Sequence, residues 1–345
     1  MLSLRFKLIG VAGLLLATAP GVAVIVPYGS GRNLSPPTGT LANAGWQYQA
    51  EFAGFLGTPI SSKWFITAQH IGGTIGSSVS YNGSSTVTDA VVDVPGTDLR
   101  LWRIAGTFST WAPMWNPATD GGEVGKRLFV VGRGTQRGAP VIAPIDGPAA
   151  PSGGGNQVAI SPDYNDPIPA GYELRGWKWG AEDRLRSWGE NVVHSVVDGG
   201  STLGPLLYFT FDRDGLLNEA ALSAGDSGGA VFVRTFAGQY KLAGINFGVD
   251  GPFRETPTSP GFYAAMFDMG GYYVYENPTE YFPPSVTDQP AGAYVSSISA
   301  NRAFINSVIA GTFAGTADVP EPSTTALAAT SAVLLIRRRR PVTPR

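Results

Sequence analysis

Short apolar runs that alternate with polar residues recur through the first third of the chain. They predict five strands between positions 46 and 110, at 47–55, 63–68, 78–81, 85–94 and 99–104. Tyr81-Asn82-Gly83 and Pro95-Gly96 are typical turn sequences and separate three of these strands. Strands this short and this evenly spaced are typical of a β-barrel or a β-sandwich. The pattern therefore predicts an all-β protein.

The apolar pattern is less regular in the second half. A second set of strands is expected across 128–249, interrupted by 140–162, where Pro, Gly and Ala predict a long surface loop. Residues 252–290 form an aromatic-rich insertion. A rim over a substrate, packing against the core and a disordered loop are all compatible with its sequence.

A strand followed by a helix is predicted at 294–310. Ile305, Val308 and Ile309 recur at helical spacing, and Gly311 can end the helix. The expected architecture is all-β with one short helix near the end of the folded region.

Three tryptophans of the second half lie among basic residues. They are Trp177, Trp179 and Trp188, interleaved with Arg175, Lys178, Arg184 and Arg186. One interpretation is an aromatic and basic strip that binds glycan or nucleic acid. We favour the alternative in which the tryptophans fill the core and the arginines stay in solvent. The formal net charge of −2 gives no electrostatic footprint for nucleic acid.

The amino terminus indicates export, and the composition excludes disulfides. Residues 1–23 combine the positive charges of Arg5 and Lys7, an apolar run and small residues at 21–23, which together predict a signal peptide. Residues 24–45 then form an extended N-terminal arm. The 345-residue chain contains no cysteine, which excludes disulfides and thiolate metal sites.

Candidate chemistry centres on Gly225-Asp226-Ser227-Gly228-Gly229. A serine hydroxyl is a useful nucleophile only beside a base and near donors for the oxyanion that it creates. The glycines allow a tight turn and a close approach of substrate. The N–H groups of Gly225 and Ser227 are then the expected oxyanion donors, although a plain hairpin turn is an alternative.

Candidates for the base and for the acid that orients it lie upstream. Of the two histidines, His70 ends an apolar run, whereas His194 lies in an alternating segment and is expected to be a structural strand residue. Asp98 opens the strand at 99–104, and Asp93 is its rival. The order His, Asp, Ser along the chain is that of the chymotrypsin class of serine proteases.

Five segments, in order, resemble trypsin-like (chymotrypsin-fold) serine proteases. They are 64–70, 97–104, 128–135, 225–229 and 242–248. The resemblance implies two six-stranded antiparallel β-barrels with a short C-terminal helix. The domain would span 46–311, with an insertion at about 250–290.

The resemblance also implies a secreted serine endopeptidase that acts on a protein or peptide through an acyl-enzyme. His70 would be the general base, Asp98 its orienting acid and Ser227 the nucleophile. No metal or cofactor and no nucleic-acid partner are expected, and the enzyme is expected to be a monomer. A catalytically inactive binding module and a structural protein of the extracellular matrix or cell surface are the alternatives.

The same resemblance predicts a specificity pocket. Ala221, six residues before the nucleophile, would lie at its base. Asn246, Phe247 and Gly248 would form one wall and pair with the substrate backbone. Because no acid stands at 221, small or apolar side chains are expected, unless a shifted loop brings in Glu219.

The amino terminus of the mature chain has a further expected role. In trypsin-like proteases a freed amino terminus pairs with the acid before the catalytic serine, which is here Asp226. Val24-Ile25-Val26 directly follows the expected signal cleavage point. Our hypothesis is that signal removal itself exposes the ammonium group that Asp226 needs.

The tail carries a three-part pattern over 312–345. Pro320-Glu321-Pro322 precedes an apolar segment at 326–336 and four arginines at 337–340. Positive charge after an apolar segment holds the carboxyl end in the cytoplasm, and the segment is short for a stable span. The pattern resembles the PEP-CTERM sorting signal of bacterial surface and secreted proteins. It implies transient membrane anchoring and recognition by an exosortase-type membrane protease.

Overall fold

The computed structural model describes residues 24–27, 31–145, 168, 170–182, 184–274 and 279–313. The leader at 1–23 and the sorting pattern from 314 onward lie outside these residues, as does most of the loop predicted at 140–162. Within the described residues, strands dominate, and no helix is long and apolar enough to cross a membrane. The predicted all-β class is confirmed.

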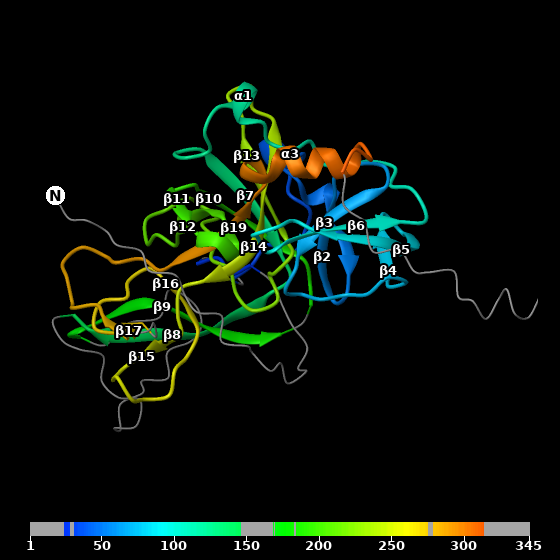
Figure 1. Ribbon diagram of the computed structural model, residues 1–345. Coiled ribbons are helices and arrows are strands. Elements are labelled where there is room, and N and C mark those ends of the chain that lie inside the picture. Colours follow the sequence, from blue (N-terminus) through cyan, green and yellow to red (C-terminus); the bar gives the residue numbers. More distant parts are fainter. Residues whose placement is uncertain are drawn as a thin grey trace, which may run out of the picture.

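The first half of the chain forms a closed six-stranded antiparallel barrel (Figure 1, blue to cyan). Its strands are β1 (Ala50–Phe52), β2 (Phe55–Pro59), β3 (Trp64–Ala68), β4 (Ser78–Tyr81), β5 (Ser84–Asp93) and β6 (Leu99–Ile104), hydrogen-bonded in the order β1-β2-β3-β6-β5-β4. The strand predicted at 47–55 is divided, because Ala53 and Gly54 have φ of 52° and 83° and form a tight turn between β1 and β2. The other four predicted strands agree with β3 to β6 to within one residue.

Aromatic side chains fill this barrel. The buried ring of Phe52 lies 5.1 Å from Phe65 and 5.0 Å from Trp102, measured between ring centroids. Such pairs typically add about 0.5–1.5 kcal/mol beyond the burial of apolar area. The indole N–H of Trp102 is also satisfied, because it donates to Thr67 Oγ1 at 3.1 Å. The interior therefore links β1, β3 and β6.

The second half contains a seven-stranded antiparallel sheet in the order β10-β7-β13-β14-β19-β12-β11. Its strands are β7 (Arg127–Gly132), β10 (Ser187–Val192), β11 (Ser195–Asp198), β12 (Pro205–Thr210), β13 (Ala230–Arg234), β14 (Tyr240–Val249) and β19 (Gly292–Ser297). Among the described residues, strand pairing gives this seven-stranded sheet and not the closed six-stranded second barrel that we expected. Instead, the side chain of Asn191 on β10 donates to Thr210 O at 2.7 Å and to Ala220 O at 3.0 Å. Between β10 and the end of β12, side-chain hydrogen bonds are therefore present where a closed barrel would have a strand ladder.

β19 leads directly into helix α3 (Ile298–Ile309), which confirms the predicted closing strand and helix. The Ser297 side chain caps the helix by accepting the Ala300 N–H at 3.3 Å. Ile298, Ile305 and Val308 are buried against the main core. The remaining short elements are η1 (Gly39–Leu41), η2 (Trp46–Tyr48), α1 (Pro117–Asp120) and α2 (Gly200–Leu203).

A third β-unit lies beside the second sheet, in the lower part of Figure 1. It contains two three-stranded sheets, β16-β9-β8 and β15-β17-β18. The strands are β8 (Thr135–Pro144), β9 (Tyr172–Glu182), β15 (Phe253–Arg254), β16 (Ala264–Met266), β17 (Tyr273–Val274) and β18 (Glu280–Tyr281). Val141, Phe253, Met266 and Tyr272 share one buried core. The described residues of the insertion are thus folded and packed, and 140–144 are strand rather than loop because they pair with β9.

The tryptophans of the second half are mainly core residues. Trp177 and Trp188 are buried, and Trp179 stacks on Tyr263 with ring centroids 4.6 Å apart. The expectation that the arginines stay in solvent is wrong for Arg175, which is fully buried and ion-paired. A buried charge is tolerated only when it is paired in this way.

Candidate active site

His70 and Asp98 lie at one end of the first barrel, where β3 ends and β6 begins. These strands are antiparallel and Ala68 is opposite Leu99, so the residues just beyond that pair leave the sheet at the same edge. The Gln69 N–H donates to Asp98 O at 2.6 Å. Strand register alone therefore brings His70 beside Asp98.

The Asp98 carboxylate contacts His70 at two points. Its Oδ1 accepts the His70 backbone N–H at 3.0 Å, and its Oδ2 lies 2.6 Å from Nδ1 of the ring. The Asp98 side chain is 8% exposed, whereas that of His70 is 41% exposed. A carboxylate at Nδ1 favours the tautomer with its proton there, which leaves Nε2 able to accept a proton.

The other titratable candidates lie elsewhere. Asp93 accepts from Arg100 Nε at 2.5 Å and from Gln69 Nε2 at 2.8 Å, so it is engaged away from the imidazole. His194 is exposed and lies between β10 and β11, not within a strand as expected, and its backbone N–H donates to Tyr208 O at 2.8 Å. In the part of the chain that the structure describes, no three His, Asp or Glu side chains gather closely enough to hold a metal ion.

Ser227 reaches the site from the second half, in the loop that precedes β13. Its Oγ lies 2.7 Å from Nε2 of His70. The ring of Phe247 stands edge-on to the imidazole, with centroids 5.9 Å apart. The three side chains named from sequence, His70, Asp98 and Ser227, thus form one hydrogen-bonded series across the two halves.

Asp226 holds the loop from inside. Its side chain is 1% exposed; Oδ1 accepts the Gly134 N–H at 2.7 Å, and Oδ2 accepts the Ser223 N–H at 2.7 Å and the Ser223 hydroxyl at 3.1 Å. Burial raises the pKa of Asp226 to about 7, although these hydrogen bonds act to lower it. All of these donors are neutral, so they do not offset the loss of solvent.

Asn246 on β14 supports the same loop, a role that the sequence did not indicate. Its side-chain amide donates to Val131 O and to Asp226 O, both at 3.0 Å. Its backbone N–H donates to Gly229 O at 2.8 Å, and its carbonyl accepts the Gly228 N–H at 3.2 Å. The Asn246 N–H is thus used within the protein, and the expectation that Asn246 pairs with a substrate backbone stays a prediction for its carbonyl, which can accept a second hydrogen bond.

Beyond Asn246, the edge of β14 on the β13 side is open. Ala230 at the start of β13 pairs with Ile245, and none of the described strands continues this pairing along Phe247 and Gly248. A Cβ added at Gly248 would meet no atom within 4 Å. This edge offers space for an extended peptide.

Two backbone N–H groups beside Ser227 are unengaged. Those of Gly225 and Ser227 donate to no acceptor among the described residues. Gly225 has a φ of 93°, and a Cβ there would lie 2.8 Å from Arg133 O, so only glycine fits without strain. Two such donors next to a serine hydroxyl can stabilise an oxyanion.

Ala221 and Glu219, both considered for the pocket, differ in their surroundings. Ala221 is buried and pairs with Ile25 through two backbone hydrogen bonds of 3.0 and 3.1 Å. Glu219 accepts the N–H groups of Leu216 and Asp212 at 2.8 and 3.4 Å. Burial raises the pKa of Glu219 to about 8. Glu219 is therefore engaged within its own loop.

Comparison with known proteins adds little. No family model matches the chain, and no curated protein matches it. Among solved structures, the chain is similar to neuropsin, a serine protease expressed in the limbic system of mouse brain, over 81% of this chain and 98% of that one. The identity is 13% and the TM-score 0.42. A likeness this weak does not assign a function, which therefore has to be inferred from the site itself.

Proposed function

We propose that this protein is a trypsin-like serine endopeptidase. The observation that carries the proposal is the hydrogen-bonded series from Asp98 through His70 to Ser227, with links of 2.6 and 2.7 Å. Two unengaged N–H groups and an open strand edge lie next to it. Acyl transfer requires this combination of nucleophile, oriented base and oxyanion donors.

The first half of the reaction forms an acyl-enzyme. A peptide added along the open edge of β14 presents a carbonyl carbon to Ser227 Oγ. His70 Nε2 takes the hydroxyl proton as the new C–O bond forms, and Asp98 stabilises the resulting imidazolium. The N–H groups of Gly225 and Ser227 donate to the oxyanion, and loss of one such donor typically costs about 3–4 kcal/mol of transition-state stabilisation.

His70 then gives its proton to the leaving amine as the C–N bond breaks, which completes the acyl-enzyme and releases the first product. The second half of the reaction is hydrolysis of this ester. Water then attacks the ester with His70 again acting as base, and the proton returns to Ser227 Oγ as the acid is released. Each proton transfer uses the same ring nitrogen.

A fluorophosphonate probe, which reacts with activated serines, tests the proposal. We expect one adduct, identified at Ser227 by mass spectrometry of the modified peptide. Ser227→Ala removes the adduct, and His70→Ala slows labelling by about 10³-fold or more. Asp93→Asn is the matched control and labels like the wild type. A folded protein that forms no adduct would favour the inactive binding module or the structural protein instead.

We also propose that removal of the leader completes the site. In support, the Ser187 hydroxyl donates to Val24 O at 3.2 Å, and Ser187 is opposite Gly132 in the ladder of β10 with β7. Gly132 packs directly against the Asp226 carboxylate, since a Cβ there would overlap it. A free amino group at Val24 would meet a buried acid whose hydrogen-bond donors are neutral. N-terminal sequencing of active enzyme is expected to begin at Val24, and an active form beginning well beyond Val26 would exclude this step.

The leader and tail motivate a proposal about location. Export through 1–23 would be followed by transient membrane anchoring through 312–345, removal of the tail by an exosortase-type protease, and release or attachment at the bacterial surface or matrix. Fractionation of producing cells tests this proposal. Deletion of 314–345 is expected to abolish the membrane-bound intermediate, and an unchanged distribution would contradict it.

A further inference from the structure

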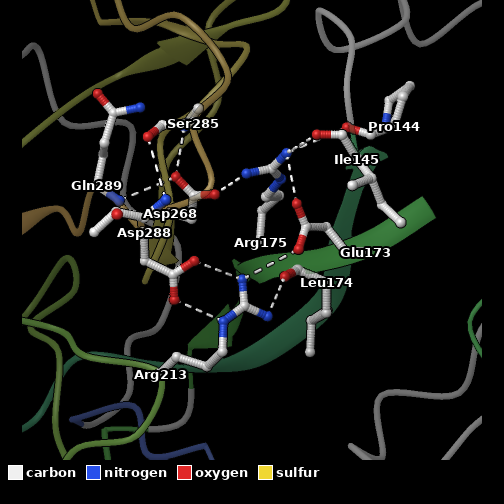
Figure 2. A network of polar contacts seen from close by, with 12 residues as sticks. Pro144, Ile145, Glu173, Leu174, Arg175, Arg213, Asp268, Ser285, Asp288 and Gln289 are labelled. Carbon is white, nitrogen blue, oxygen red and sulfur yellow. Dashed lines mark hydrogen bonds and ion pairs between the residues drawn. The ribbon is translucent and has the colours of Figure 1, made fainter. Parts of the chain in front are cut away.

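Positive charges are treated differently at the two ends of the second half. In the third β-unit, fully buried Arg175 pairs with Glu173 and Asp268 (Figure 2). Arg213 donates to the Asp288 carboxylate from Nε at 2.7 Å and from Nη2 at 2.9 Å. The arginines of this network are thus neutralised within the protein. At the other end, beside α1 in Figure 1, exposed arginines surround an exposed aromatic ring.

This ring belongs to the turn between β13 and β14. Phe236, in the turn, is 95% exposed. The Thr235 N–H donates to Gln239 O at 2.7 Å, and the Gly238 N–H donates to Thr235 O at 2.9 Å. The Thr235 side chain also accepts the Gln239 N–H at 3.1 Å. Hydrogen bonds therefore close the turn, and it presents a large apolar side chain to solvent.

A second loop, just before β7, lies against this turn. Lys126 Nζ is 5.0 Å from the centroid of the Phe236 ring and 4.6 Å from that of buried Trp115. A cation is attracted to the face of an aromatic ring at such distances. Val124 in the same loop is exposed. The two loops thus form one surface whose exposed apolar residues are Phe236 and Val124.

Two arginines flank this surface. Arg234 ends β13 and Arg127 begins β7, and both are exposed. Val233 is opposite Leu128 in the ladder of these strands, so the two arginines follow that pair at the same end of the sheet. Among the described residues, neither arginine forms an ion pair. Their charges therefore face solvent.

Three acids of the same region are buried. Asp120, Glu123 and Glu190 are each at most 9% exposed. Asp120 is also neutralised by Lys241, whose Nζ lies 2.7 Å from its Oδ1. The charge that this surface presents to solvent is therefore positive. We refer to its exposed apolar and basic residues as the hairpin patch: Val124, Lys126, Arg127, Arg234 and Phe236.

We propose that the hairpin patch binds the surface of a bilayer that contains anionic phospholipids. An aromatic ring is favoured at the boundary between headgroups and acyl chains, and arginine binds phosphate groups strongly. Basic residues beside an exposed apolar side chain fit both parts of this boundary. The inference does not rest on the proposed function.

The position of the patch leaves the candidate active site accessible. Ser227 precedes β13 and Phe236 follows it. A strand of five residues spans about 17 Å, so the patch and the nucleophile lie at opposite ends of β13. Binding through the patch therefore keeps Ser227 away from the bilayer and open to a substrate in solution.

A fluorescent reporter beside Phe236 tests the inference. The chain has no cysteine, so a single introduced cysteine can carry a nitrobenzoxadiazole dye, whose emission shifts to the blue in an apolar environment. Ala237→Cys places the dye next to Phe236, and Ser84→Cys places it at an exposed position of the first barrel. With the full chain and vesicles of equal parts phosphatidylglycerol and phosphatidylcholine, we expect a blue shift at 237 and none at 84. The predicted leader and tail can also attach the chain to vesicles, but attachment through them does not move the dye at 237 into lipid.

Further changes in the Ala237→Cys chain test the two parts of the patch. Phe236→Ala should lower the ratio of inserted to solvent-exposed dye by about tenfold or more. Arg234→Gln should lower it by about fivefold.

Leu217→Ala is the matched control for Phe236→Ala. Leu217 is 80% exposed, but the nearby Asp212 and Asp214 are exposed acids, which anionic lipid repels. The ratio should therefore stay within about twofold.

Three results would overturn the inference. They are an aqueous emission at 237 in the presence of the anionic vesicles, an equal shift with vesicles of phosphatidylcholine alone, and an equal effect of Phe236→Ala and Leu217→Ala. Fluorophosphonate labelling of the same preparations keeps this test separate from the proposed function. We expect Ser227 to be labelled equally with and without Phe236→Ala. An unlabelled Ser227 refutes the catalytic assignment, whereas a labelled Ser227 with no shift at 237 refutes only the membrane surface.

Discussion

The two halves of the molecule bring their residues to the site by different means. In the first barrel, five consecutive residue pairs align β3 with β6, and His70 and Asp98 lie just beyond the last of them. In the second half, Ser227 lies in a loop whose shape depends on buried side chains. Asp226 holds that loop through neutral donors, and Asn246 holds it through two carbonyls.

This difference indicates where each half is vulnerable. Ladder hydrogen bonds are made by the backbone, so most single side-chain changes in the first barrel are expected to preserve the positions of the base and the acid. A buried polar group left without its partner costs about 1–3 kcal/mol and has no water to replace the lost bond. Changes beneath the nucleophile loop are therefore expected to damage both stability and activity.

The largest loss of activity is expected from a change to Asp98, the one side chain of the first half that orients the base. Asp98→Asn preserves the shape of the side chain, but an amide neither favours the correct tautomer of His70 nor stabilises its charged form. We expect kcat/KM to fall by about 10⁴-fold. Asp93→Asn is the matched control, because Asp93 bonds at the surface to Arg100 and Gln69 and not to the imidazole, and should stay within about twofold. Lost activity in Asp93→Asn, with activity kept in Asp98→Asn, would show that the acid is misassigned.

The next largest effect is a dependence of the free energy of unfolding on pH, caused by the buried carboxylate of Asp226 in the second half. In a chain extended before Val24, folded Asp226 keeps its proton up to about pH 7, while the unfolded chain ionises near pH 3.8. The unfolded state then binds fewer protons between these values, so the free energy of unfolding falls as pH rises through this window. At about 1.4 kcal/mol for each pKa unit, Asp226 contributes at most about 4.5 kcal/mol to this fall. Urea unfolding at several pH values measures it.

Two variants check this pH dependence. Asp226→Asn should remove the share of Asp226 and leave a smaller fall from Glu219, whose pKa burial also raises, and the exposed Asp198→Asn should leave the whole fall unchanged. A chain that begins at Val24 should also lose the share of Asp226 if its ammonium group pairs with Asp226. A free energy of unfolding that rises across this window in the extended chain would contradict the raised pKa.

A third, smaller effect is expected from Asn246→Ala. The change removes the amide that donates to the carbonyls of Val131 and Asp226, the second of which keeps the Gly229 N–H, and should lower the free energy of unfolding by about 2–3 kcal/mol. Because the loop carries Ser227, kcat should also fall by about tenfold or more. Urea unfolding and steady-state kinetics measure the two quantities separately.

Asn191 offers a matched control for that change. It too is a buried asparagine whose amide donates to two backbone carbonyls, but these belong to Thr210, at the end of β12, and to Ala220, seven residues before Ser227. Asn191→Ala should cost a similar free energy of unfolding while kcat stays within about twofold. If both variants lose activity equally, general loosening of the second half, and not support of the loop, explains the loss.

The contrast between the halves also explains what could be predicted from sequence. In the first barrel, alternation of apolar residues and two turn sequences locate the strands, and His70 and Asp98 stand at strand ends. The positive φ of Ala53, which divides β1 from β2, has no such signal, because a non-glycine residue rarely adopts it.

The second half was less predictable, because its stabilising contacts join residues that are distant in the chain and have no periodicity. The support that the Asn246 amide gives to the nucleophile loop had no signal in the sequence. Arg175 was expected in solvent and is instead buried with Asp268. The seventh strand of the second sheet and the third β-unit also depend on contacts between residues that are distant in the chain. Sequence thus located the three residues of the candidate site better than it located their supports.

The smallest expected effect tests the robustness of the first barrel. Thr67→Val removes the hydroxyl that accepts from the buried indole of Trp102, and should lower the free energy of unfolding by about 1–2 kcal/mol. In a Trp102→Phe background the same change should cost about 1 kcal/mol less, because no indole N–H is left unpaired. Thr67 is only three residues from His70, yet the ladder between β3 and β6 does not use its side chain. Fluorophosphonate labelling should therefore stay within about twofold of the wild type. A labelling rate that falls by about tenfold or more would mean that a buried hydroxyl, and not backbone register, positions the base.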